Sequence, residues 1–266
     1  MNKIFTPVLT VAGSDNSGGA GLQADLKTFM AHNCYGLSAV SAITVQNIMK
    51  FEKFEAVAPS LVYDQIKTAI ELTPPLAVKT GMLATSDNID AVANAIQNFN
   101  LQKIVIDPVL KSSTGKNLIS ENFINTLRKH LIPLAYVITP NKMEAEYLTD
   151  IKIQSYEDVK RAAEIIFEMG AKNVIIKGGH LEFDEDQSTD TLFNGKTHQP
   201  FSVKKIKTAG FHGTGCTFSA SLCANLALGL DISEATKSAK DYTLNTMIQQ
   251  CNNTPAGVLN HIIKRD

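Results

Sequence analysis

The chain has 266 residues, of which 25 are Lys or Arg and 26 are Asp or Glu, so its formal net charge at pH 7 is −1. This balance excludes a broad nucleic-acid-binding surface as the main activity, because such surfaces need an excess of positive charge. With 44% hydrophobic and 19% charged residues, the chain can bury a large core, which excludes intrinsic disorder. We expect one domain over residues 1–266, since a single α/β domain can reach about 250 residues or more.

Short, continuously apolar runs alternate with segments of helical periodicity. The runs have the composition of strands covered on both faces, and they occupy residues 8–12, 39–45, 104–107, 136–139 and 173–177, with a further strand near residue 78. The helical segments lie near residues 19–32, 59–72, 86–99, 120–131, 155–169, 214–230 and 233–249. Ser60, Ser86 and Ser155 stand where N-caps are expected. Strands alternating with helices predict an α/β protein with a parallel, doubly wound sheet.

One region departs from this alternation. Residues 182–187 form an acidic stretch, and residues 191–197 contain an Asn194-Gly195 pair. Asn-Gly between apolar runs is typical of a two-stranded turn. We expect an acidic loop followed by a hairpin that adds an antiparallel edge to the sheet.

Neither a membrane span nor an export signal is expected. No apolar run approaches the roughly 18 residues that a bilayer requires, and residues 1–7 are broken too early for a secretory signal. The cysteines Cys34, Cys216, Cys223 and Cys251 include no Cys-x-x-Cys pair, which argues against a disulfide framework and a structural zinc site. We therefore expect a soluble protein of the reducing cytoplasm, with neither membrane nor nucleic acid as a partner.

Polar and glycine-rich stretches follow the predicted strands, at the edge of a parallel sheet where ligands bind. The first of them, at residues 19–24, matches Gly-x-Gly-x-x-Ala, but no acidic residue between Asp25 and Glu52 could bind the ribose of a dinucleotide. A P-loop is also excluded, because Gly-Lys-Thr occurs only at residues 195–197 and Asp190 replaces the required earlier glycine. The first glycine cluster instead predicts either a tight turn into a helix or a place where a substrate approaches the backbone.

The glycine-rich stretch at residues 208–217 precedes an apolar helix. Glycines at a helix start expose N–H groups at the positive end of the helix dipole, a geometry that binds phosphate. Cys216 falls in the first turn, where this field is expected to favour the thiolate and lower the cysteine pKa. An equally open interpretation makes Cys216 a buried structural cysteine. His212 is expected to orient this turn and His180 to border the site.

A cation and three oxygen-bearing side chains come from other strand ends. Lys177 and Asp107 each end a strand, and Asn141 and Glu144 are three residues apart at the opening of a helix. Such oxygen ligands, with water, suit Mg²⁺ bridging nucleotide phosphates. Each also has a structural explanation, Asn141 as a helix cap and Glu144 as first-turn charge. Their convergence at one sheet edge favours a nucleotide site.

Taken in order, these stretches resemble one known family over nearly the whole chain. The chain resembles the ribokinase-like superfamily, and within it the hydroxymethylpyrimidine/phosphomethylpyrimidine kinases of thiamine biosynthesis. The motifs that carry the resemblance are Ala12-Gly13-Ser14-Asp15, residues 17–28, Thr44-Val45-Gln46-Asn47, residues 79–83, Asp107-Pro108-Val109, Thr139-Pro140-Asn141 with Glu144, residues 177–180 and residues 212–217.

The resemblance implies a three-layer αβα sandwich with a mostly parallel central sheet, a homodimer, and the use of ATP with Mg²⁺. It implies that a hydroxymethyl-bearing pyrimidine lies against Gly13, Ala20, Met82 and Val109. The Gln46 amide would read the ring nitrogen and amino group, because a carboxamide offers an acceptor and donors in one plane.

For the nucleotide, the resemblance implies that Lys177 holds the phosphates. Asn141 and Glu144 would hold Mg²⁺ and its waters, with Asp107 helping through the metal shell.

Gly213 and Gly215 would supply the anion hole, and Cys216 would stand where sugar kinases of the superfamily have an Asp base. Phe211 departs from the family pattern, which has a small polar residue before the His-Gly pair.

The expected activity is ATP-dependent phosphorylation of 4-amino-5-hydroxymethyl-2-methylpyrimidine and then of its monophosphate. Two alternatives stay open. One is a pyridoxal kinase of the same branch, which Gln46 disfavours. The other is a non-catalytic pyrimidine-binding regulator, against which the joint presence of Lys177, Glu144 and Cys216 argues.

Overall fold

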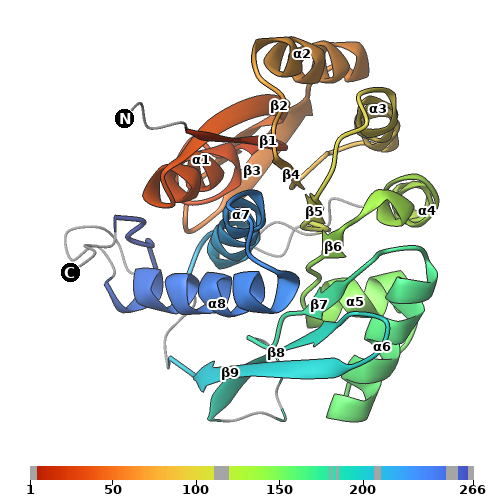
Figure 1. Cartoon of the computed structure of the whole chain (residues 1–266), viewed down its shortest axis with the longest axis vertical. Helices are drawn as coiled ribbons and strands as arrows, with labels where there is room; N and C mark the ends of the chain where they lie inside the picture. The colour runs from red at the N-terminus through yellow and green to blue at the C-terminus, as the bar shows by residue number, and fades with distance from the viewer. Residues whose placement is uncertain are drawn as a thin grey trace.

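A central sheet crosses the molecule, with helices on both of its faces (Figure 1). The computed structural model describes residues 5–110, 120–179, 181, 183, 186–206, 211–249 and 257–262. The arrangement confirms the predicted α/β class and the three-layer αβα sandwich. Residues 182, 184 and 185 of the acidic stretch, residues 208–210, His180 and Cys251 lie outside the described residues.

The strands are β1 (Thr6–Ser14), β2 (Cys34–Gln46), β3 (Phe51–Ala56), β4 (Ala77–Thr80), β5 (Ile104–Ile106), β6 (Val137–Ile138), β7 (Val174–Ile176), β8 (Gln187–Phe193) and β9 (His198–Lys204). They form one nine-stranded sheet in the order β3-β2-β1-β4-β5-β6-β7-β8-β9. Neighbours from β2 to β7 in this order are parallel, whereas β3, β8 and β9 are antiparallel. The carboxyl ends of the parallel strands therefore meet at one edge of the sheet.

The helices are α1 (Gly21–Ala31), α2 (Pro59–Leu72), α3 (Ser86–Asn98), α4 (Glu121–Thr126), α5 (Lys142–Thr149), α6 (Tyr156–Glu168), α7 (Thr214–Ala227) and α8 (Ile232–Ile248). A π-helical turn at Leu127–Leu131 continues α4 through the predicted helix at residues 120–131. Within the described part of the chain, none of the helices is long and apolar enough to cross a membrane.

Successive side chains of the inner strands enter two separate cores. Leu9 of β1 and Ile176 of β7 belong to the core that includes residues of α2, α3 and α6. Val8 and Ile175, one position earlier on the same strands, belong to the core formed with α1, α7 and α8. Because adjacent residues of a strand point to opposite faces, a strand covered on both faces must be apolar throughout. This is why the sequence runs are continuous rather than alternating.

The helix starts agree only in part with the predicted caps. Ser155 caps α6, and its Oγ accepts a hydrogen bond from the Asp158 N–H at 3.2 Å. For α3 the cap is Thr85 rather than Ser86, which is the first helical residue. Ser60 is also inside its helix, because Pro59 begins α2. Pro suits the first helical position, since its missing N–H is not needed there.

The predicted hairpin is confirmed by β8 and β9. Asn194 Oδ1 accepts hydrogen bonds from the N–H groups of Lys196 and Thr197, both at 3.0 Å, which closes the turn. The other antiparallel edge, β3, was not predicted, because its side chains are exposed or half-buried and its sequence has no apolar run. The structure also extends β2 to 13 residues, beyond the predicted residues 39–45.

Candidate active site

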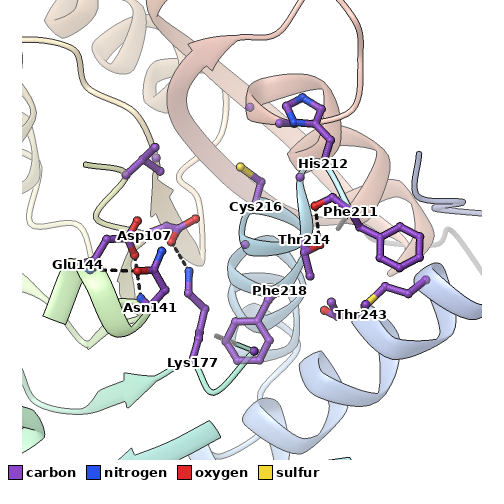
Figure 2. Close-up of a pocket in the computed structure, with 18 of the residues that line it drawn as sticks. Asp107, Asn141, Glu144, Lys177, Phe211, His212, Thr214, Cys216, Phe218 and Thr243 are labelled. Carbon is purple, nitrogen blue, oxygen red and sulfur yellow. Dashed lines mark hydrogen bonds and ion pairs between the residues drawn. The ribbon is translucent and has the colours of Figure 1, made fainter. Parts of the chain in front are cut away.

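A cavity of about 780 Å³ opens at the edge of the sheet where the parallel strands end. Its lining includes His212 and the residues assigned to substrate, nucleotide or catalysis from the sequence, whereas His180 lies outside the described residues. Those assigned residues are Gly13, Ala20, Gln46, Met82, Asp107, Val109, Asn141, Glu144, Lys177, Gly213, Gly215 and Cys216. The structure thus brings together residues from strands and loops spread over most of the chain. Figure 2 shows Asp107, Glu144 and Lys177 on one side of the first turn of α7. Phe211 and Thr243 lie on the other side.

The part of the cavity near β1 and β2 is held together by hydrogen bonds between side chains and backbone groups. Thr44 Oγ1 donates to the Ser14 carbonyl at 2.7 Å, and the Gln46 N–H donates to Asn16 Oδ1 at 2.9 Å. The Ser41 hydroxyl donates to the Met82 carbonyl at 2.5 Å. The first two bonds hold the end of β2 against the loop after β1, and the third holds β2 against the segment after β4, which carries Met82.

Lys177 and Asp107 form an ion pair across the ends of β7 and β5. Lys177 Nζ lies 2.8 Å from Asp107 Oδ1, and Ser219 Oγ of α7 donates to Asp107 Oδ2 at 3.2 Å. Burial raises the pKa of Asp107, but Lys177 and Lys79 more than offset it, so that its pKa is lower than usual. The pair therefore carries a full negative and a full positive charge in the wall of the cavity.

Asn141 and Glu144 are joined in a capping box at the start of α5. Asn141 Oδ1 accepts from the Glu144 N–H at 3.0 Å, and Glu144 Oε2 accepts from the Asn141 N–H at 2.8 Å. The structural explanation is thereby confirmed, although both residues also line the cavity. Burial raises the pKa of the Glu144 carboxyl to about 7, even though Lys177 acts in the opposite sense. Glu144 can thus take up a cation at the cost of releasing a proton near neutral pH.

The turn before α7 depends on two glycines. Gly213 has φ +85°, and a Cβ there would lie 1.8 Å from the Gly19 carbonyl oxygen, so no side chain fits. A Cβ on Gly215 would lie 3.2 Å from Lys177 Nζ. Among the described residues, no side chain caps this helix. Gly213, Thr214 and Gly215 line the cavity together with Lys177. The first-turn N–H groups are thus placed at the cavity wall beside a lysine, an arrangement that can bind an anion, and we refer to it as the anion-binding turn.

Cys216 is a neutral thiol, which corrects the predicted thiolate. Its side chain lines the cavity and is partly exposed there. Burial raises the pKa of the Cys216 thiol to about 11, although the charge of Lys79 and a hydrogen bond from the Gly21 N–H oppose this effect. The prediction was wrong because it counted the helix field and not the loss of water around the sulfur.

A buried ion pair that was not assigned a role from the sequence includes Lys79, which lines the cavity. Lys79 Nζ lies 2.7 Å and 2.8 Å from the two carboxylate oxygens of Asp25, and both side chains are fully buried. Thr10 Oγ1 donates to Asp25 at 2.6 Å. Burial lowers the pKa of Lys79, but Asp25 raises it further, so the lysine stays charged. It is this charge that acts on Cys216.

Replacing Asp25 by alanine is expected to destabilise the fold by about 3–5 kcal/mol, because it leaves the Lys79 charge buried without its partner. Chemical denaturation followed by circular dichroism measures the change. As a control, Lys50→Ala removes an ion pair with Glu52 on the surface and should leave the midpoint nearly unchanged. Equal midpoints for the two variants would contradict a paired, charged Lys79.

The end of the cavity toward α8 is mostly apolar, and of its residues only Phe211 was noted from the sequence. It is lined by Val203, Ile206, Phe211, Phe218, Leu244 and Met247. These residues come from β9, the segment after it, and helices α7 and α8. No local motif marks them, so only the packed structure could reveal them. Lys240 stands in the same wall and pairs with Asp190 at 2.8 Å.

Comparison with known proteins gives a consistent result. A family model described as phosphomethylpyrimidine kinase matches residues 15–259. The chain is 42% identical over 234 residues, 88% of its length, to 86% of a hydroxymethylpyrimidine/phosphomethylpyrimidine kinase of Bacillus subtilis (strain 168). It is 40% identical, with TM-score 0.79, to a phosphomethylpyrimidine kinase structure from Clostridium difficile 630, covering 90% of this chain and 97% of that one.

Pyridoxal kinase structures are also similar to this chain, with a higher TM-score but a lower sequence identity than the C. difficile structure. The Staphylococcus aureus pyridoxal kinase in complex with AMP-PCP and pyridoxal is 36% identical with TM-score 0.88, covering 97% of this chain and 94% of that one. The family model and the identity to the B. subtilis kinase confirm the resemblance inferred from the motifs. The chain belongs to the phosphomethylpyrimidine kinase family.

Proposed function

We propose that this protein transfers the γ-phosphoryl group of ATP to the hydroxymethyl group of 4-amino-5-hydroxymethyl-2-methylpyrimidine, and in a second reaction phosphorylates the monophosphate. The observation that carries this proposal is that one cavity is lined both by the residues expected to hold a pyrimidine and by a lysine, two carboxylates and an anion-binding turn. Membership of a kinase family supports the same reaction.

For the acceptor, the proposal assigns Gly13, Ala20, Met82 and Val109 to the faces of the ring and Gln46 to its polar edge. A carboxamide can both donate and accept in one plane, which matches a ring nitrogen beside an amino group. The small residues let the ring approach the backbone closely.

The residues around Lys177 fit a divalent cation that arrives with a nucleotide. In the described part of the chain, no group of three His, Cys, Asp or Glu side chains could hold a metal ion alone. Asp107 and Glu144 supply two carboxylates, and Mg²⁺ in nucleotide sites is held by one or two carboxylates together with phosphates and water. When bound, Mg²⁺ would neutralise phosphate charge.

During transfer, Lys177 and the N–H groups of the turn at Gly213 and Gly215 would stabilise charge on the moving phosphoryl group. The transition state of phosphoryl transfer is loose, so the alcohol does not need to lose its proton early. A neutral Cys216 thiol is compatible with this, because it can accept a hydrogen bond from the hydroxyl and orient it toward phosphorus.

The substrate assignment is tested by measuring ADP release with hydroxymethylpyrimidine, its monophosphate, pyridoxal and ribose. We expect turnover with the two pyrimidines well above that with ribose. The likeness to the S. aureus pyridoxal kinase favours pyridoxal as the second candidate substrate. Pyridoxal turnover alone would overturn the pyrimidine assignment, and binding without any ADP release would favour a regulator.

We also propose a homodimer, because apolar side chains are exposed together on β2 and the turn after it. Ile43, Val45 and Met49 are 52%, 40% and 79% exposed. Analytical ultracentrifugation should show a dimer for the wild-type protein and a shift toward monomer for Ile43→Lys. Identical sedimentation profiles would place the interface elsewhere.

A cytoplasmic location is supported by the free thiols of Cys34, Cys216 and Cys223. One domain is supported by the continuous sheet.

A further inference from the structure

Asp15 and His212 join the two sides of the cavity through a buried contact. Asp15 is the first residue after β1, and His212 directly precedes the turn at Gly213. His212 Nε2 lies 2.8 Å from Asp15 Oδ2, and both side chains are almost fully buried. In Figure 2 His212 lies on the opposite side of Cys216 from Lys177. The pair is therefore placed to connect loops rather than to contact phosphate.

The Asp15 carboxylate organises the loop at residues 15–20. Its Oδ2 accepts from the N–H groups of Gly19 at 3.1 Å and Ala20 at 2.8 Å, and its Oδ1 accepts from the N–H of Ser17 at 2.9 Å and from its hydroxyl at 2.8 Å. Burial raises the pKa of Asp15, but these bonds and the one from His212 lower it to about 2. A carboxylate can only accept, so His212 Nε2 carries the hydrogen in this contact.

His212 is held from the other side by the C-terminal segment at residues 257–262. Its N–H donates to the Gly257 carbonyl at 3.0 Å, and it forms a β-bridge with Val258. Its ring packs tightly against the loop, because a Cβ on Gly19 would lie 2.6 Å from His212 Cδ2. The anion-binding turn is therefore held on one side by the C-terminal segment and on the other by the loop that carries Ala20.

The Asp15–His212 contact links the two segments proposed to hold the acceptor and the phosphoryl group. Ala20 lies in the part of the cavity proposed to hold the acceptor, and the next residue, Gly21, lines the same cavity as Cys216. The N–H groups proposed to bind the phosphoryl group belong to the turn that His212 anchors. Efficient transfer needs the reacting atoms about 3–3.5 Å apart, and a displacement of about 1 Å can cost a factor of about 10². Water is small and enters in many orientations, so hydrolysis depends less on this alignment.

We propose that the Asp15–His212 pair is a positioning device that aligns the acceptor alcohol with the anion-binding turn and so decides how much phosphoryl reaches the alcohol rather than water. The inference rests on the proposed function. In the productive reaction, the alcohol oxygen bonds to the γ-phosphorus as the bond from that phosphorus to the bridging oxygen of ADP breaks, and the hydroxyl proton is released. In the side reaction, water takes the place of the alcohol and yields inorganic phosphate.

The test is the coupling ratio, which is the phosphorylated acceptor formed per ADP released. For His212→Leu we expect kcat with the acceptor to fall by about 10–100-fold, the ratio to fall clearly below that of the wild type, and the affinity for ATP to change little. His212→Gln places an amide N–H near the position of Nε2 and should restore most of the ratio. Asp15→Asn weakens the same contact and should lower the ratio.

Controls separate this role from a merely structural one. His198→Leu removes another histidine–carboxylate contact, 3.0 Å to Glu164 and away from the cavity, and should leave the ratio unchanged. An unchanged ratio in both His212→Leu and Asp15→Asn would overturn the proposal, as would equal losses of ratio in His212→Gln and His212→Leu. If His212→Leu does not fold, His212→Gln and Asp15→Asn decide between a lowered and an unchanged ratio.

The ratio is measured with whichever acceptor the wild-type protein phosphorylates. Turnover of pyridoxal but not of the pyrimidines would therefore refute the proposed substrate while the role of the pair is still decided by the variants. A wild-type protein that phosphorylates no acceptor would refute both.

Discussion

Replacing Cys216 by alanine is expected to lower turnover of the pyrimidine by about 10²-fold, because the hydrogen bond that orients the acceptor hydroxyl toward phosphorus is lost. Affinity for ATP should persist, because the N–H groups of the turn belong to the backbone and remain. Steady-state ADP release gives the first quantity, and calorimetric titration with a non-hydrolysable ATP analogue gives the second.

Cys216→Ser is the matched variant, since a hydroxyl can also accept a hydrogen bond from the alcohol, and we expect a smaller loss. Near-normal turnover of Cys216→Ala would remove this residue from the reaction. The neutral thiol has a further consequence: because the pKa of Cys216 is raised to about 11, its alkylation by iodoacetamide should be slow at pH 7 and accelerate up to pH 9.

Replacing Lys177 by methionine should reduce turnover by about 10²–10³-fold, because a fixed positive charge beside the transferred group is lost. ATP affinity should fall as well, which distinguishes this variant from Cys216→Ala. ADP release and calorimetric titration measure both effects. Full activity would show that the phosphates bind elsewhere in the cavity.

Lys177→Met also leaves the buried Asp107 carboxylate without its ion-pair partner, so the fold should lose stability. A double variant separates the two effects. Adding Asp107→Asn removes the unpaired charge and should recover part of the stability without recovering turnover. Recovery of turnover by the double variant would mean that Lys177 acts only through Asp107.

Elements whose cause is local could be predicted from the sequence. The inner strands were found because covering on both faces makes them apolar throughout, and the hairpin because Asn194-Gly195 specifies its own turn. β3 has neither signal, since its side chains are exposed or half-buried and it lies at the edge of the sheet.

The candidate site also has parts that a local sequence pattern predicts and parts that only the packed structure reveals. The cavity residues near Gly213 and Lys177 carry recognisable motifs, so the sequence predicts that they share one sheet edge. The contact between Lys79 and Asp25 joins positions 54 residues apart, and no local pattern pairs them. The pKa of Cys216 likewise depends on how much water packing removes from the sulfur, which no local pattern reports.

The contact between the Gly213 backbone and the Gly19 carbonyl limits how this enzyme could be redesigned. Two main chains that touch cannot be moved apart by trimming a side chain, so that region offers no room for bulkier acceptors. Met82 is different, because its thioether lies within 3.4 Å of where a Gly13 Cβ would be and Met side chains adapt their shape easily. Libraries of variants aimed at new acceptors should therefore change Met82 and Val109 and leave Gly19 and Gly213 unchanged.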